Sequence, residues 1–98
     1  MTETQLKIKV LKYLRSLPNV WAYKASDKFT SGIPDIIGCR NGRLLAIELK
    51  VGKNKLTKLQ EHVLGKIIEA NGIAFVAYSI DDVKKEVQTW TKKSYCSN

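Results

Sequence analysis

The sequence predicts a small α/β fold in which a mixed β-sheet is flanked by helices. Its 98 residues suffice for one compact domain. A composition of 44% apolar and 27% charged residues is typical of a folded globular protein. Segments with helical apolar spacing alternate with short segments rich in strand-forming residues. We therefore expect a single domain over residues 1–98 with the element order α-β-β-β-α-β-α.

The N-terminal part is predicted to form a helix, a strand and a loop. Residues 3–17 carry apolar side chains at helical spacing, and Thr2 with Gln5 forms a capping box at their start. Residues 20–25 are aromatic and β-branched, which favours a strand. The polar stretch 26–32 is expected to be a loop.

A β-hairpin is predicted in the middle of the chain. Strand-like runs over 33–39 and 44–51 flank the dipeptide Asn41-Gly42. A two-residue type I′ turn needs positive φ at both central positions, and Asn-Gly suits it well. The turn therefore predicts both the hairpin and its register.

The C-terminal part is predicted to cross over the sheet and return to it. A second capping box opens a helix over 57–70, and a short apolar strand follows over 73–78. Right-handed crossover would make this strand parallel to 44–51. Residues 80–90 are expected to form a last amphipathic helix, with a frayed polar tail beyond it.

The charge balance indicates an anionic partner. Seventeen Lys and Arg residues against nine Asp and Glu residues give a net charge of +8. Such an excess suits the phosphate backbone of nucleic acid, with solubility as the alternative explanation. The apolar runs are too short for a membrane span, and the N-terminus lacks the features of a signal peptide. Cys39 and Cys96 lack disulfide or metal spacing, so we expect free thiols in a reducing cytoplasm.

Two acidic residues are predicted to face each other across the hairpin. Counting back from the turn places Asp35 opposite Glu48, and Lys50 projects from the same face. Opposed carboxylates destabilise a sheet unless a cation neutralises them, and Mg²⁺ or Mn²⁺ prefers such oxygen ligands. A metal that activates water, beside a lysine that stabilises an anion, suits phosphodiester hydrolysis. The alternative is an ordinary exposed pair of acids bridged by Lys50.

These residues resemble the signature of the PD-(D/E)xK nuclease superfamily. Over residues 3–87 the chain is similar to its virus-type replication-repair nuclease (VRR-NUC) domain, which implies a restriction-endonuclease-like core. The motifs that carry the resemblance are Gly32-Ile33-Pro34-Asp35, Glu48-Leu49-Lys50, Leu56-Thr57 and Gln60.

The resemblance implies a metal site and a substrate. The metal ligands would be Asp35, Glu48 and the main-chain carbonyl of Leu49, with Lys50 as the catalytic lysine and Glu3 as a contributing helix-one glutamate. Stand-alone members, often from phages, are associated with four-way-junction cleavage. The implied protein is thus a homodimer that resolves Holliday junctions in DNA repair, in the cytoplasm of a bacterial host if it is phage-encoded.

Several side chains have both a functional and a structural interpretation. The resemblance places Gln60 at the active site, but Gln60 is also the capping-box partner of Thr57. Glu3 also suits the helix dipole. Four lysines are expected to contact DNA phosphates or to form a solvated surface: Lys24, Lys53, Lys55 and Lys58. Four aromatic residues could stack on bases, although packing is favoured: Trp21, Tyr23, Phe29 and Trp90.

Other functions remain open from the sequence. A flap- or nick-directed DNA nuclease would use the same acids and lysine. A non-catalytic nucleic-acid-binding module, or an adaptor that binds an acidic protein, would need only the basic surface. The sequence Gly52-Lys53 lacks the remaining residues of a phosphate-binding loop, so no nucleotide cofactor is expected. His62 has no second ligand at metal-binding spacing.

Overall fold

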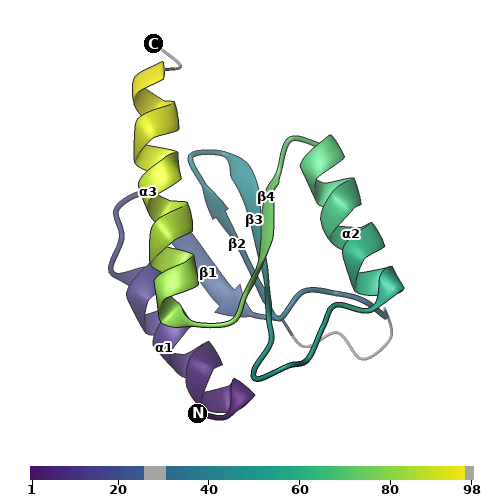
Figure 1. Ribbon diagram of the computed structural model, residues 1–98. Coiled ribbons are helices and arrows are strands. Elements are labelled where there is room, and N and C mark those ends of the chain that lie inside the picture. Colours follow the sequence, from purple (N-terminus) through teal and green to yellow (C-terminus); the bar gives the residue numbers. More distant parts are fainter. Residues whose placement is uncertain (26–30, 97–98) are drawn as a thin grey trace.

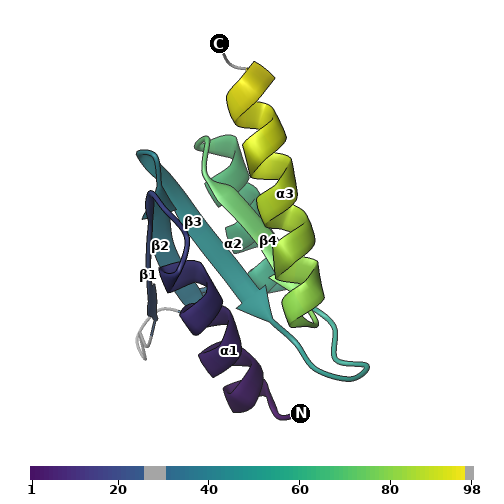
Figure 2. The same ribbon diagram turned by 90° about the vertical axis from the view of Figure 1, so that its left-hand side faces the viewer.

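The computed structural model describes residues 1–25 and 31–96, with the backbone alone over residues 91–96. It confirms the predicted α/β class and element order. Helix α2 covers one face of the sheet, and α1 and α3 cover the other (Figures 1 and 2). The elements are α1 (Glu3–Arg15), β1 (Val20–Lys24), β2 (Ile36–Arg40), β3 (Arg43–Leu49), α2 (Lys58–Glu69), β4 (Ile73–Ala77) and α3 (Ile80–Cys96).

The sheet has the predicted mixed topology. Within the described residues its strand order is β1-β2-β3-β4. Strands β1, β2 and β3 pair antiparallel, whereas β3 and β4 are parallel, as the crossover through α2 requires. Asn41 and Gly42 have φ values of 50° and 81°, and Arg40 pairs with Arg43. The predicted turn and hairpin register are confirmed.

Both predicted capping boxes are present. The Thr2 hydroxyl accepts from the backbone N–H of Gln5, and the Thr57 hydroxyl accepts from the backbone N–H of Gln60. In return, each glutamine side-chain oxygen accepts from the backbone N–H of its threonine. These reciprocal bonds satisfy amides at the first turn that have no partner inside the helix.

Several element boundaries differ from the prediction. Strand β2 begins at Ile36 rather than 33, because Pro34 has no N–H for the sheet. Strand β3 ends at Leu49 rather than 51. The expectation of a frayed tail after Trp90 was wrong, since α3 continues to Cys96. Residues 91–96 are polar but contain neither proline nor glycine, so nothing in them breaks a helix.

The hydrophobic core lies between the sheet and the pair α1 and α3. Ile36, Ile47 and Leu49 are fully buried there. Leu6 and Leu14 supply the α1 side of the same core. Because strand side chains alternate between faces, Glu48 must emerge on the other face, which α2 partly covers.

The cysteines and the helices were also the subject of sequence predictions. Cys39 is free, as expected, and it is exposed. The side chain of Cys96 and most of the 26–32 loop lie outside the described residues. Across the described ranges, no helix combines the length and apolar character needed to span a bilayer.

Strands β1 and β2 approach most closely at Gly38. A Cβ atom there would press on the Trp21 carbonyl oxygen and lie 2.8 Å from the Ala22 Cα. These are backbone atoms of the paired strand and have no rotamer into which to retreat. The edge strand β1 therefore depends on a glycine at this position.

We expect Gly38→Ala to lower the free energy of unfolding by about 3 kcal/mol, because overpacking must displace backbone. Urea denaturation measures this value. Gly65→Ala is the control, since a Cβ at Gly65 in α2 meets nothing within 4 Å. That substitution should stabilise the helix by about 0.5–1 kcal/mol. Equal stability of the Gly38 variant and the parent would contradict this packing account.

Candidate active site

Asp35 immediately precedes β2 on a tightly packed backbone. Gly32 has φ +82°, and a Cβ there would lie 2.9 Å from the Cγ of Leu59 in α2. Pro34 is fully buried. The Ala25 N–H donates to the Asp35 carbonyl oxygen over 2.9 Å. Residues 32–35 therefore lie packed between β1 and α2, which fixes the backbone of Asp35.

The Asp35 carboxylate joins three elements. Its Oδ2 accepts a hydrogen bond of 2.8 Å from the Leu49 N–H in β3. Its Oδ1 lies 3.6 Å from the Lys7 ammonium of α1, and both side chains are only 18% exposed. The Asp35 carboxyl group also lies close enough to that of Glu48 to raise the pKa of Glu48. The sequence prediction that these two acids meet is confirmed by this contact.

Glu48 is a buried acid with an unsatisfied oxygen. Its side chain is 4% exposed, and its Oε2 has no hydrogen-bond partner among the described residues. Burial, and then the hydrogen bond and charge of Asp35, raise the pKa of Glu48 to about 8. Lys50 opposes this rise in the pKa, and Glu3 adds to it. Glu48 therefore holds its proton more tightly than an exposed glutamate does.

The donor set fits a hard divalent cation. A buried oxygen without a partner, beside a second carboxylate, is an arrangement that a cation satisfies. In the described part of the chain, no three His, Cys, Asp or Glu side chains converge to hold a metal. Further ligands would have to be main-chain or water oxygens, which Mg²⁺ accepts readily. Leu49 directly follows Glu48, and its N–H already binds Asp35. Its main-chain carbonyl therefore belongs to a residue that is in contact with the acid pair.

Lys50 and Glu3 lie within electrostatic reach of the acids. Lys50 directly follows β3, where its N–H donates to the Ala77 carbonyl oxygen over 3.1 Å. Its charge lowers the pKa of Glu48, and the carboxylate of Glu3 raises it. The first turn of α1 and the end of β3 therefore contribute to one electrostatic site, although no direct bond from Glu3 to either acid is recorded in the described residues.

Gln60 is engaged in its helix cap. Its Oε1 accepts from the Thr57 N–H over 2.9 Å, and its own N–H donates to the Thr57 hydroxyl over 3.1 Å. This geometry supports the structural interpretation of Gln60. A part for Gln60 at the active site stays a prediction.

The four predicted DNA-binding lysines fall on different surfaces. Lys53, Lys55 and Lys58 are exposed on the segment that runs from Lys50 into α2. Lys24 is also exposed, but it pairs with Ile36 and so projects from the α1 face, opposite to Glu48. Contact of these lysines with DNA stays a prediction, and the first three are the better placed for it.

Sequence reasoning missed Lys7. It lies one helical turn after Glu3, so both side chains project from the same side of α1. That spacing was a usable signal. It was obscured because α1 also carries Lys9 and Lys12, and helical spacing alone does not tell which lysine meets the sheet.

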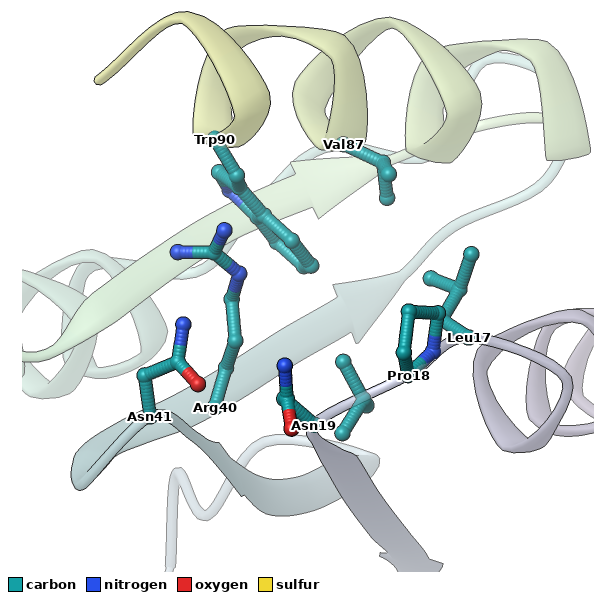
Figure 3. Close-up of a pocket in the computed structure, with 8 residues that line it drawn as sticks. Leu17, Pro18, Asn19, Arg40, Asn41, Val87 and Trp90 are labelled. Carbon is teal, nitrogen blue, oxygen red and sulfur yellow. The ribbon is translucent and has the colours of Figure 1, made fainter. Parts of the chain in front are cut away.

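A separate cavity of about 140 Å³ lies beside the far end of β2 (Figure 3). The Arg40 guanidinium lies over the Trp90 ring there, 5.3 Å from its centroid. Trp90 is buried and meets Phe75 edge-on at 6.5 Å, so packing, the favoured interpretation of Trp90, is confirmed. Phe29 lies outside the described residues. This cavity is at the opposite end of β2 from the acids.

The fold is shared with solved VRR-NUC domains. One similar solved structure, described as a VRR-NUC domain, has a TM-score of 0.74 at 20% identity and covers 88% of this chain and 94% of its own. A second, described as a VRR-NUC domain protein, has a TM-score of 0.71 at 19% identity, with coverages of 94% and 89%. These likenesses confirm the predicted fold.

The chain belongs to the archaeal Holliday junction resolvase (Hjc) family, whose sequence profile matches residues 16–91. The solved Archaeoglobus fulgidus Hjc, described as a Holliday junction resolvase from an archaeal hyperthermophile, has a TM-score of 0.59 at 24% identity and covers 78% of this chain and 67% of its own. No curated protein matches the sequence. The predicted enzyme class, a nuclease that hydrolyses DNA, is confirmed. The matched residues include Asp35, Glu48 and Lys50 but begin after α1.

The raised pKa of Glu48 predicts a pH-dependent stability in the presence of a chelator. The folded state holds this proton more tightly than the unfolded state does, so the stabilisation is full below about pH 4.5 and is lost as the pH rises through about 8. The melting temperature should therefore fall between pH 6 and pH 9. Glu48→Gln, which stays neutral, should flatten that fall in calorimetry. An unchanged slope in the variant would show that Glu48 does not titrate in this range.

Proposed function

We propose that this protein is a divalent-metal-dependent endonuclease that resolves four-way DNA junctions as a homodimer. The observation that carries the metal site is the buried Oε2 of Glu48, which has no hydrogen-bond partner within the described residues although a second carboxylate lies beside it. Membership of the Holliday junction resolvase family supports the junction as substrate.

Each residue of the site would have a distinct part. Asp35, Glu48 and the Leu49 carbonyl would hold Mg²⁺ or Mn²⁺, which when bound supplies a Lewis acid and lowers the pKa of a water ligand. Lys50, on the same side of the hairpin, would stabilise negative charge on the phosphate in the transition state. Glu3 would add a carboxylate from α1, as the resemblance to VRR-NUC domains implies.

The basic segment beside the site supports an approach by DNA. Lys53, Lys55 and Lys58 follow Lys50 along the chain and are exposed. The segment is tied to the fold because the Tyr78 hydroxyl donates to the Asn54 carbonyl oxygen over 2.8 Å. Phosphates bound there would lie along the chain segment that leads from the catalytic lysine into α2.

Asp35→Ala and Lys50→Ala should each lower the rate of four-way-junction cleavage by at least about a hundredfold. The first removes a ligand of the proposed metal, and the second removes the charge that would stabilise the reacting phosphate. The measurement is a gel assay with labelled junctions, flaps and plain duplexes, with Mg²⁺, Mn²⁺ or EDTA. Paired symmetric cuts that disappear with EDTA are the expected result.

The control is Lys12→Ala, which removes an exposed lysine from the last turn of α1. It should leave junction cleavage close to the parent rate. Cleavage of flaps or duplexes alone would keep the nuclease and overturn the junction as substrate. Binding of DNA without cleavage, unaffected by EDTA, would overturn the catalytic proposal in favour of a binding module.

An uncharged part of one sheet face, over β1 and β2, supports the homodimer. The register places Trp21, Cys39 and Leu44 in one row, and Tyr23 beside Ile37 in the next row, all on the face of Glu48. Helix α2 packs on β4 and β3, and Trp21 stays 61% exposed.

Charge favours a second copy as the occupant of this face. From Trp21 to Tyr23 and from Ile37 to Cys39, no charged side chain lies on it, because Lys24 and Arg40 belong to the opposite face. Asp35 lies beyond this stretch, just before β2. In a chain of net charge +8, two copies can meet here without bringing lysines together.

Trp21→Glu should convert the dimer into a monomer, because each copy would bury a new carboxylate in the interface. Light scattering would then report the mass of one chain, 11.1 kDa, in place of twice that mass. Ile8→Glu is the control, since Ile8 is equally exposed on α1, across the sheet from Trp21. It should remain a dimer. A monomeric parent protein, or an unaffected Trp21 variant, would rule out this interface.

A further inference from the structure

Lys7 supplies a positive charge to the acid pair from outside the family motif. It belongs to α1, which precedes the matched residues 16–91. Its ammonium lies 3.6 Å from Asp35 Oδ1, with both side chains 18% exposed. An ion pair this shielded is screened less by solvent than a surface pair.

The ion pair divides the Asp35 carboxylate between two partners. Oδ2 accepts from the Leu49 N–H at 2.8 Å, and Oδ1 faces Lys7. Of the two carboxylate oxygens of Asp35, Oδ1 is thus the one that an ammonium already neutralises. A cation binding at this carboxylate would meet Lys7 as a like charge.

We propose that Lys7 is an exchangeable counter-ion of the active site: it neutralises Asp35 before metal binding and moves to a DNA phosphate when the metal takes its place. The inference rests on the proposed metal site. Two features make the exchange feasible. The lysine stem is flexible, and the single contact recorded for its ammonium in the described residues is Asp35. The phosphate diester supplies the negative charge that Lys7 loses when it leaves Asp35.

The direction in which Mn²⁺ affinity changes when Lys7 loses its charge tests the exchange. If Lys7 competes with the cation, then removing its charge should tighten binding of Mn²⁺, because a repulsion between like charges disappears. If Lys7 only holds Asp35 in position, the same change should weaken binding of Mn²⁺. The two interpretations therefore differ in direction and not merely in size.

The experiment is calorimetric titration of the full chain with Mn²⁺ in the absence of DNA. Lys7→Met keeps the length of the side chain and removes its charge, and we expect roughly three- to tenfold tighter binding. Lys7→Gln is the second variant, in case the methionine disturbs folding. Lys12→Met is the matched control, since it removes one exposed charge from the same helix and should change affinity little. Equal or weaker binding in both Lys7 variants would overturn the proposal.

A second measurement tests the phosphate contact. With Ca²⁺ in place of Mg²⁺ to prevent cleavage, Lys7→Met should bind a four-way junction more weakly. Its salt dependence, log K against log salt, should become shallower by about 0.9, the value for one phosphate contact. An unchanged slope would overturn this half of the exchange.

Asp35→Asn separates failure of this inference from failure of the proposed function. If Asp35→Asn retains full Mn²⁺ binding, the metal site itself is wrong. If Asp35→Asn loses binding while the Lys7 variants do not gain it, the metal site stands and the counter-ion exchange is refuted.

Discussion

The register of one hairpin determines both the core and the candidate active site. Positive φ values at Asn41 and Gly42 close a two-residue turn, and the pairing that follows directs Ile36 and Ile47 into the core. A slip by one residue would exchange the two faces of a strand. Glu48 would then enter the apolar core. The apolar packing that stabilises the sheet is therefore also what holds the two acids together.

The acids lie where the fold is locally unfavourable. Glu48 is buried beside a second carboxylate, and one of its oxygens lacks a hydrogen-bond partner in the described part of the chain. Lys7, Lys50 and the Leu49 N–H reduce this unfavourable energy without removing it. A site that is poorly satisfied alone and well satisfied by a cation is typical of a binding function. In the proposed metal site, the loss of local stability at these acids would be offset when the cation binds.

Much of the fold and the acid pair could be predicted because their signals are local. Capping boxes, the Asn-Gly turn and apolar spacing each lie within a few residues, and the hairpin register extends that local signal to Asp35 and Glu48. Lys7 could not be identified, because its contact depends on how α1 packs against the end of the sheet. The sequence left Lys24 open between a DNA contact and a solvated surface, because the face of a strand residue depends on its pairing. The pairing with Ile36 places Lys24 opposite to Glu48. The length of α3 was missed because polar composition was given more weight than the absence of helix breakers.

The most direct test of the account is the location of a metal. A crystal grown with Mn²⁺ and measured at the manganese absorption edge would show each bound ion as an anomalous peak. The account predicts a peak within bonding distance of Asp35, Glu48 and the Leu49 carbonyl. A peak elsewhere with none between these acids, or no peak at saturating Mn²⁺, would contradict the proposal that the two acids hold a metal.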